Sequence, residues 1–155
     1  MDLQRQELLE ATLITVLEQF AFLFADLVEK DEIEVEESEF AMVSLSFTGD
    51  FSGQLVLATP SSSCVEIAAN VLGTDPSNPK AQEDAQDAMQ ELANVCCGHI
   101  LTAIAGDEPV FDLGVPSFGI LSLEEWNSLY QDPETLVFIV EDFPLLLRWT
   151  DTRAS

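Results

Sequence analysis

The sequence predicts an α+β fold in which a mainly antiparallel sheet packs against long helices. Several segments repeat apolar residues at the spacing of a helix, and others alternate apolar and polar residues between glycine-containing turns, as strands do. The order of these segments is helix, strands, two helices and strands, which is typical of this class. With 155 residues, 47% of them hydrophobic, residues 1–155 are expected to form a single domain with a hydrophobic core.

The first part of the chain predicts a helix and then an antiparallel pair of strands. Apolar residues recur at helical spacing at Leu9, Leu13, Val16, Leu17, Phe20, Phe24 and Leu27. Residues 31–37, DEIEVEE, alternate apolar and acidic residues and predict an exposed edge strand. Residues 39–49, EFAMVSLSFTG, alternate apolar residues with smaller or polar ones and predict a half-buried strand. Gly49, Asp50 and Gly53 mark a turn, after which residues 54–58, QLVLA, are expected to return as its partner strand.

Capping residues mark two helices in the middle of the chain. Thr59 is expected to cap the first, with Pro60 at its first position and Gly73 at its end. Asn78 is expected to cap the second, a long helix that stops at Gly106.

The last part of the chain predicts short strands and a closing hairpin. Residues 110–122 contain turn residues and short apolar runs, and a polar stretch, LEEWNSLYQDPE, follows them. Residues 135–150 predict two strands with a turn near residues 142–144.

The net charge of −24, with only five Lys and Arg residues, restricts the kind of partner. Binding to nucleic acid and to an anionic membrane surface is not expected, because both need basic side chains. Residues 11–28 are apolar, but Glu18, Gln19 and Asp26 interrupt them, so a membrane span is not expected. The acidity either serves solubility alone or suits a protein that presents a lysine or a metal site.

The three cysteines, Cys64, Cys96 and Cys97, do not form the pattern of a disulfide framework. A reduced, cytoplasmic setting is therefore expected, and the first twenty residues have no basic segment or cleavage site typical of a signal peptide. His99 follows the cysteine pair, but no CxxC or HxxxH spacing supports a metal site, so none is expected.

One narrow polar stripe runs along the long second helix. With successive residues 100° apart, five positions fall within about 80° of one another. They are Asp87, Glu91, Asn94, Gly98 and Thr102. Apolar residues fill most of the remaining circumference, so the helix is expected to expose one ridge and bury the rest. The ridge could simply be the solvent-exposed polar face that every surface helix has.

Two members of this ridge lower the local stability of the helix. Asn is a poor helix former, and Gly costs about 1 kcal/mol relative to Ala in a helix interior. Without a side chain at Gly98, the backbone of a partner could approach the helix one turn beyond Asn94. These residues therefore favour a ridge that is kept for access by another molecule.

The same residues resemble the signature of the CheC/CheX/FliY phosphatases of bacterial chemotaxis. That signature is an Asp or Ser, a Glu four positions later, an Asn three positions after it and a glycine four further on. Asp87, Glu91, Asn94 and Gly98 stand in this register, and the likeness extends over roughly residues 10–150. The resemblance implies a CheC-like fold and activity on the aspartyl phosphate of a CheY-like response regulator.

The resemblance is closer to CheX, whose members carry one motif in each subunit and form dimers, than to CheC, which carries two. A second Glu-x-x-Asn string, Glu124 to Asn127, lacks the preceding Asp and the glycine and is interpreted as chance. His99 departs from the family, whose members often have Asn or another polar residue there, and it is expected to be packed. The apolar face of the first helix and the strand-rich C-terminus are both candidate dimer surfaces.

In the family, the Asn carboxamide holds a water in line with the phosphorus, and the Glu pairs with a lysine of the regulator. The resemblance therefore implies that Asn94 orients the water, that Glu91 docks the regulator and that Asp87 and Gly98 support the ridge. The resemblance also implies that the Mg²⁺ would belong to the phosphorylated regulator, so that this protein needs no cofactor of its own. Two alternatives stay open: a non-enzymatic module that only binds the phosphorylated regulator, and an unrelated soluble α+β domain.

Overall fold

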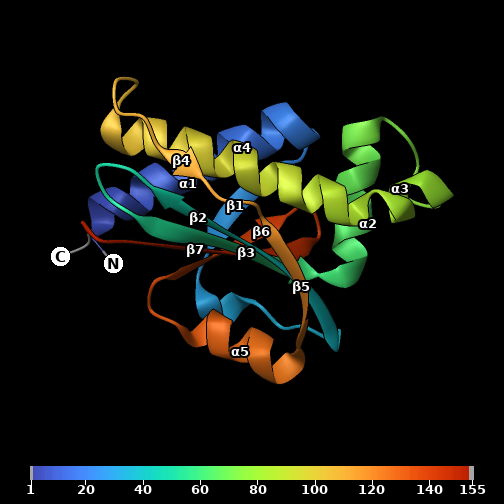
Figure 1. Cartoon of the computed structure of the whole chain (residues 1–155). Helices are drawn as coiled ribbons and strands as arrows, with labels where there is room; N and C mark the ends of the chain where they lie inside the picture. Colours follow the sequence, from blue (N-terminus) through green and yellow to red (C-terminus); the bar gives the residue numbers. More distant parts are fainter. Residues whose placement is uncertain (1, 154–155) are drawn as a thin grey trace.

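The computed structural model describes residues 2–153, and in them one seven-stranded sheet carries helices on both faces (Figure 1). The strand order is β1-β6-β7-β3-β2-β4, with β5 also paired to β2, and every pair is antiparallel. The α+β class predicted from the sequence is confirmed. The strands are β1 (Ala25–Val28), β2 (Glu39–Thr48), β3 (Gly53–Pro60), β4 (Asp112–Leu113), β5 (Ser117–Ser122), β6 (Thr135–Val140) and β7 (Phe143–Asp151).

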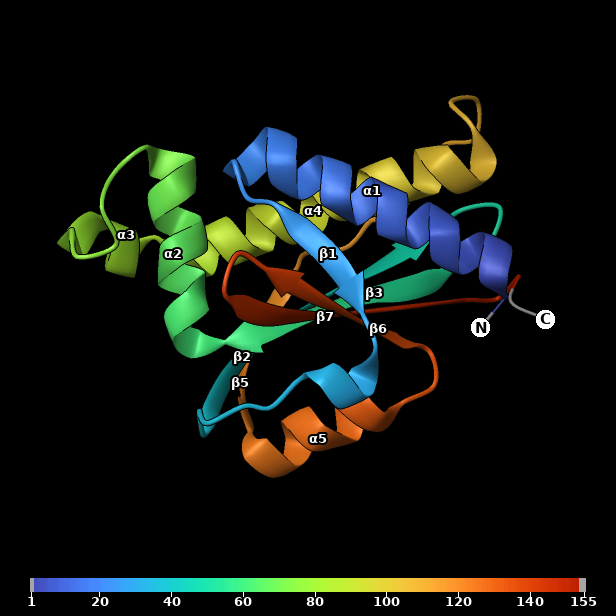
Figure 2. The same cartoon turned by 180° about the vertical axis from the view of Figure 1, so that it is seen from behind.

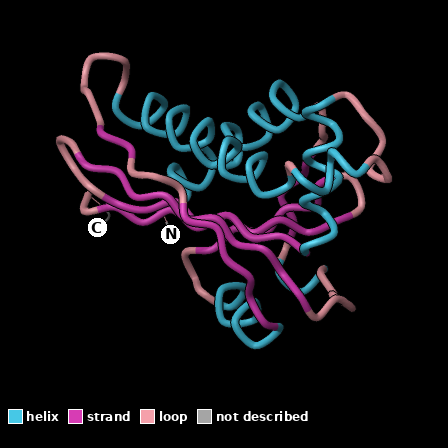
Figure 3. The backbone as a smooth tube through the Cα atoms, turned by 45° about the vertical axis from the view of Figure 1, so that its right-hand side comes forward, coloured by secondary structure: helices cyan, strands magenta, loops and turns pink. Residues whose placement is uncertain are grey.

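The helices are α1 (Leu3–Ala21), α2 (Ser61–Leu72), α3 (Pro79–Glu83), α4 (Ala85–Ala105) and α5 (Leu123–Gln131), with a short 3-10 helix, η1 (Lys30–Glu32). Helices α1, α2 and α4 lie over one face of the sheet, α3 packs on α2 and α4 on that same side, and α5 covers the opposite face (Figures 2 and 3). Both α1 and α2 pack against α4, which is thereby held on the sheet from two sides. Among the described residues, no helix has the length and hydrophobicity of a transmembrane segment.

The main core lies between the sheet and helices α1, α2 and α4. From α4 it receives the fully buried Met89, Leu92, Ala93, Cys96, Cys97 and Ile100. From the sheet it receives alternate residues of β2 and β3, including Leu45 and Leu55, as the period-2 pattern predicts. Burial raises the pKa of the Cys97 thiol to about 12, so this thiol stays neutral and packs as a small apolar group.

The first helix is shorter than predicted and gives way to a strand. It ends because Phe22 takes up a left-handed conformation, with φ of 55°. The backbone N–H groups of Phe22 and Leu23 then close the last turn on the carbonyls of Glu18 and Leu17. The predicted continuation to Leu27 is wrong, since β1 there pairs with β6.

The edge strand predicted from DEIEVEE is also wrong. Residues 30–32 form η1, and residues 33–37 belong to no strand. The edge beside β6 is already taken by β1, and the half-buried Ile33 and Val35 pack instead against the smaller core on the α5 side.

The polar stretch LEEWNSLYQ forms helix α5, which the sequence analysis missed. Ser122 and Glu125 form a capping box at its start. Trp126 is buried and stacks on Phe40 of β2 with ring centroids 4.3 Å apart, which fixes α5 on the sheet. The spacing of Ser122 and Glu125 was the local signal that could have identified this helix.

The caps in the middle of the chain agree only in part with the prediction. Asn78 does cap a helix, accepting a hydrogen bond of 2.9 Å from the Lys80 N–H, and Gly73 does end α2. Thr59 caps nothing, because its Oγ1 donates to the Pro144 carbonyl at 2.8 Å. The long second helix is interrupted at Asp84, so that α3 and α4 are separate.

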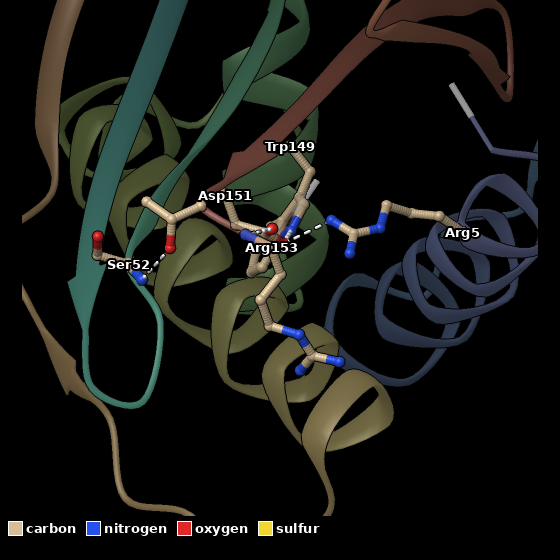
Figure 4. A network of polar contacts seen from close by, with 6 residues as sticks. Arg5, Ser52, Trp149, Asp151 and Arg153 are labelled. Carbon is tan, nitrogen blue, oxygen red and sulfur yellow. Dashed lines mark hydrogen bonds and ion pairs between the residues drawn. The ribbon is translucent and has the colours of Figure 1, made fainter. Parts of the chain in front are cut away.

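A polar network ties the end of β7 to the start of α1 (Figure 4). The fully buried Asp151 carboxylate accepts hydrogen bonds from Arg5 Nη1 and from Trp149 Nε1, the latter at 2.8 Å, and from the Arg153 N–H at 2.8 Å. Burial acts to raise the pKa of Asp151, but these donors and the charge of Arg5 together hold it below its usual value. The carboxylate therefore stays ionised and fixes the first turn of α1 against the sheet.

Candidate functional site

The polar ridge of α4 faces solvent, as the sequence predicted. Asp87, Glu91 and Thr102 are exposed, whereas Asn94 and Gly98 are half-buried. The opposite side of the helix is buried in the main core. The helical periodicity of this segment therefore identified the exposed face correctly, although Ala103, expected in the buried arc, is exposed.

Glu91 and Asn94 project from the same side of α4, about 60° apart around its axis and one turn along it. Within the part of the chain that the structure describes, neither side chain takes part in a hydrogen bond or an ion pair. A carboxylate and a carboxamide are thus available, next to each other, for groups of another molecule.

Gly98 lies between Glu91 and Asn94 around the axis of α4. Packing within the chain does not require a glycine at this position. A Cβ atom built at this position would meet nothing within 4 Å, and the residue has no left-handed backbone conformation that would call for glycine. The absence of a side chain therefore leaves open space on the ridge rather than making room for a neighbouring element.

His99 is exposed, so the prediction that it is packed is wrong. It lines a groove of about 600 Å³ between α1 and α4, together with Thr12, Thr15, Thr102 and other residues of the two helices. Helix α2 lies beside the N-terminal part of α4 (Figures 1 and 2), whereas His99 belongs to its C-terminal half. His99 projects about 140° away from Asn94 around the helix axis and thus faces α1 rather than the ridge.

A loop borders the ridge on the side of Asn94. Residues 107–116 leave the end of α4 and run back along it, and Gln90 Nε2 donates a hydrogen bond of 3.0 Å to the Pro116 carbonyl. Gly98, Leu101 and Thr102 of α4 line a hollow of about 190 Å³ against this loop. The ridge therefore has a hollow on each of its sides.

The second Glu-x-x-Asn string lies on the far side of the molecule. Glu124 and Asn127 are exposed on α5, which packs on the sheet face opposite to α4 (Figures 1 and 2). The two strings therefore form separate surfaces, and Asn127 provides an exposed helical Asn in a comparable context.

Across residues 2–153, no three His, Cys, Asp or Glu side chains group closely enough to hold a metal ion. Cys64, Cys96 and Cys97 are free and buried, and burial raises the pKa of the Cys64 thiol to about 12.

Comparison with known proteins identifies the family. The model of the chemotaxis phosphatase CheX matches residues 41–126, more than half of the chain. A search of curated proteins gives no significant match.

Solved structures of CheX share the fold. The CheX of Desulfovibrio desulfuricans superposes with a TM-score of 0.68 at 13% identity, over 96% of this chain and 99% of that one. The CheX of Vibrio vulnificus gives a TM-score of 0.65 at 16% identity, over 96% of each chain. The CheX–CheY–BeF3–Mg²⁺ complex of Borrelia burgdorferi contains a chain that superposes with a TM-score of 0.63 at 15% identity, over 95% of this chain and 97% of that one.

These identities are low, so the superpositions show the fold alone, and they confirm the CheC-like fold that the resemblance implied. The family model, in contrast, includes the whole of α4 with its ridge. The chain belongs to the CheX family of chemotaxis phosphatases.

Proposed function

We propose that residues 1–155 form a single CheX-like domain that accelerates hydrolysis of the aspartyl phosphate of a CheY-like response regulator. The observation that supports this most is the exposed Glu91 beside the half-buried Asn94 on the ridge of a CheX-family chain. Among the described residues, neither side chain has a hydrogen-bond or ion-pair partner. The Borrelia protein of this fold forms a complex with CheY, beryllium fluoride and Mg²⁺, which suggests the kind of partner.

Asn94 orients the attacking water in this proposal. Its carboxamide both accepts and donates hydrogen bonds, so it can hold a water in line with the phosphorus atom. It has no basic group at neutral pH, and an acyl phosphate needs little more than a correctly placed water. Asn94 is half-buried, and its neighbours on the helix surface, Gln90 and Leu101, lie against residues 107–116.

Glu91 docks the regulator by pairing with a lysine close to the phosphorylated aspartate. The carboxylate is exposed and lies on the side of the ridge away from the loop, where a long basic side chain can reach it. Asp87, one turn earlier, adds negative charge to the same side, and Gly98 lets the partner approach closely. The net charge of −24 favours encounter with a partner that presents a lysine.

The protein supplies no cofactor of its own in this mechanism, and the Mg²⁺ is bound by the regulator. A cytoplasmic location fits the three free cysteines. A homodimer is proposed from the family resemblance alone. Neither surface considered from the sequence is free for it, because the apolar face of α1 is buried in the main core and β6 and β7 lie inside the sheet.

The decisive experiment measures phosphate release from a phosphorylated regulator with and without the protein. Asn94→Ala should lower the acceleration about 10²-fold, or about 3 kcal/mol, while leaving binding largely intact. Asn127→Ala on α5 is the matched control and should have no effect, since it also removes an exposed helical carboxamide. A parental rate for Asn94→Ala would rule out its role.

Glu91→Ala should weaken binding to the phosphorylated regulator, and Glu124→Ala is its control on α5. Unchanged affinity combined with reduced turnover would contradict the docking role. If the protein binds the phosphorylated regulator tightly but does not accelerate phosphate release, it is a non-enzymatic interaction module.

A further inference from the structure

Three aliphatic side chains are exposed together on the loop that borders the ridge. Val115 is 90% exposed, Val110 81% and Leu113 40%. The sequence as a whole is strongly acidic, with 29 Asp and Glu residues. Among the other exposed large hydrophobic residues, Phe22 and Phe24 lie at the end of α1, away from the ridge. A group of exposed aliphatic residues in one short loop marks a contact surface more often than a single exposed residue does.

The loop is anchored in the fold, so the exposure is not the result of a loose segment. Phe111 packs edge-on against Phe51 and Phe47, with ring centroids 4.9 Å and 6.1 Å apart. The Gly114 N–H donates to the Ser46 carbonyl at 2.8 Å, and β4 pairs with β2. These contacts hold Phe111 inward while its neighbour Val110 faces solvent.

The loop lies on a defined side of the catalytic pair. Two residues of α4 contact the loop: Gln90 donates a hydrogen bond to the Pro116 carbonyl, and Leu101 lines the hollow. Around the helix axis they lie about 40° and about 20° from Asn94, both on the side away from Glu91. Asn94 therefore lies between the loop with its exposed aliphatic residues on one side and the carboxylates of Glu91 and Asp87 on the other.

We infer that Val110, Leu113 and Val115, here named the apolar border, form the second contact area for the regulator, against an apolar surface of its receiver domain next to the phosphorylated aspartate. This inference rests on the proposed function. The apolar border is continuous with the ridge, so a partner that pairs with Glu91 and covers Asn94 also reaches the loop.

The size of the apolar border also fits this occupant. Three aliphatic side chains offer much less area than the ~1,600 Å² of a standard stable interface, so alone they do not support a second copy of the chain. As the edge of a transient interface they have two effects. They keep bulk water away from the Asn94 side of the phosphoryl group, and they select regulators with an apolar surface at that place.

The test uses the double substitution Val110→Ser and Val115→Ser in the full chain. Both side chains are largely exposed, so the melting temperature should not change. The Kd for a regulator loaded with beryllium fluoride and Mg²⁺ and the KM for phosphate release should both rise about tenfold or more, with kcat little changed. Leu123→Ser, which removes a partly exposed aliphatic side chain on α5, is the matched control and should leave all three constants at the parental value.

The outcomes separate this inference from the proposed function. If the parental protein neither binds the regulator nor releases phosphate, the proposed function fails and the inference falls with it. If the parental protein is active and the double variant keeps its Kd and KM, the inference alone is overturned. A change in oligomeric state of the double variant without a change in Kd would assign the apolar border to contacts between copies, and this would also overturn it.

Discussion

Replacing Gly98 by alanine should change the stability of α4 and the binding of a partner to its ridge in opposite directions. A Cβ atom at this position meets no atom within 4 Å, and the residue lies in the interior of a 21-residue helix. The substitution therefore creates no clash and gains only the better helix propensity of alanine. We expect the variant to be more stable and less active.

The expected gain in the free energy of unfolding is about 1 kcal/mol, the difference between Gly and Ala in a helix interior. For a chain of this length, such a gain raises the melting temperature by about 2–4 °C. On the ridge, the added methyl group stands where the partner's backbone would approach. Overpacking of this kind costs about 1–3 kcal/mol, which corresponds to a rise in Kd of about 5-fold to about 150-fold.

The assay combines thermal unfolding, followed by far-UV circular dichroism, with binding to the phosphorylated regulator. Gly73→Ala is the matched control, because its added Cβ also meets nothing within 4 Å but its φ is +70°. This control should lose about 1 kcal/mol of stability, since a left-handed conformation is unfavourable for alanine, and it should keep its affinity. A lower melting temperature for Gly98→Ala, or an unchanged Kd, would refute the reasoning.

Two further predictions concern His99 and Asp151. His99→Asn should retain the parental kcat in the phosphate-release assay, because the side chain faces the groove beside α1; a loss of tenfold or more would place it in the reaction. Asp151→Asn should destabilise the protein by about 2 kcal/mol at pH 7, since it removes a charged acceptor of three donors. The folded pKa of Asp151 is lowered, so its stabilisation is present above the ordinary aspartate pKa and is lost as the pH falls through the folded value. Urea unfolding should therefore show the difference between variant and parent shrinking below about pH 4; a difference that stays constant down to pH 2 would contradict the ionised network.

The candidate site could be predicted from the sequence because it is built on one helix. Asp87, Glu91, Asn94 and Gly98 depend for their alignment only on the 3.6-residue period of α4, and the structure places all four on its open side. His99 could not be predicted in the same way. Its exposure depends on which part of α4 the neighbouring helices cover (Figures 1 and 2), and no local sequence pattern records this.

The strands of the sheet also divide into those that a local sequence pattern predicts and those that depend on contacts between remote segments. The central pair of strands β2 and β3 is separated by one short turn, so alternation and glycines were sufficient to predict it. The outer strand β1 pairs with β6, where Ala25 lies opposite Val140, and this choice is made between segments that are remote in the sequence. Residues 25–28 continue an apolar helical pattern, and only the pairing with β6 makes them a strand.

By itself, the sequence determined the acidic character of the protein, the central hairpin and the exposed ridge with its carboxylate and carboxamide. Each of these follows from composition or from a repeat within one element. The tertiary structure alone decided the end of α1, the position of His99 and the apolar border beside Asn94, because these depend on which remote segments compete for the same edge or cover the same face.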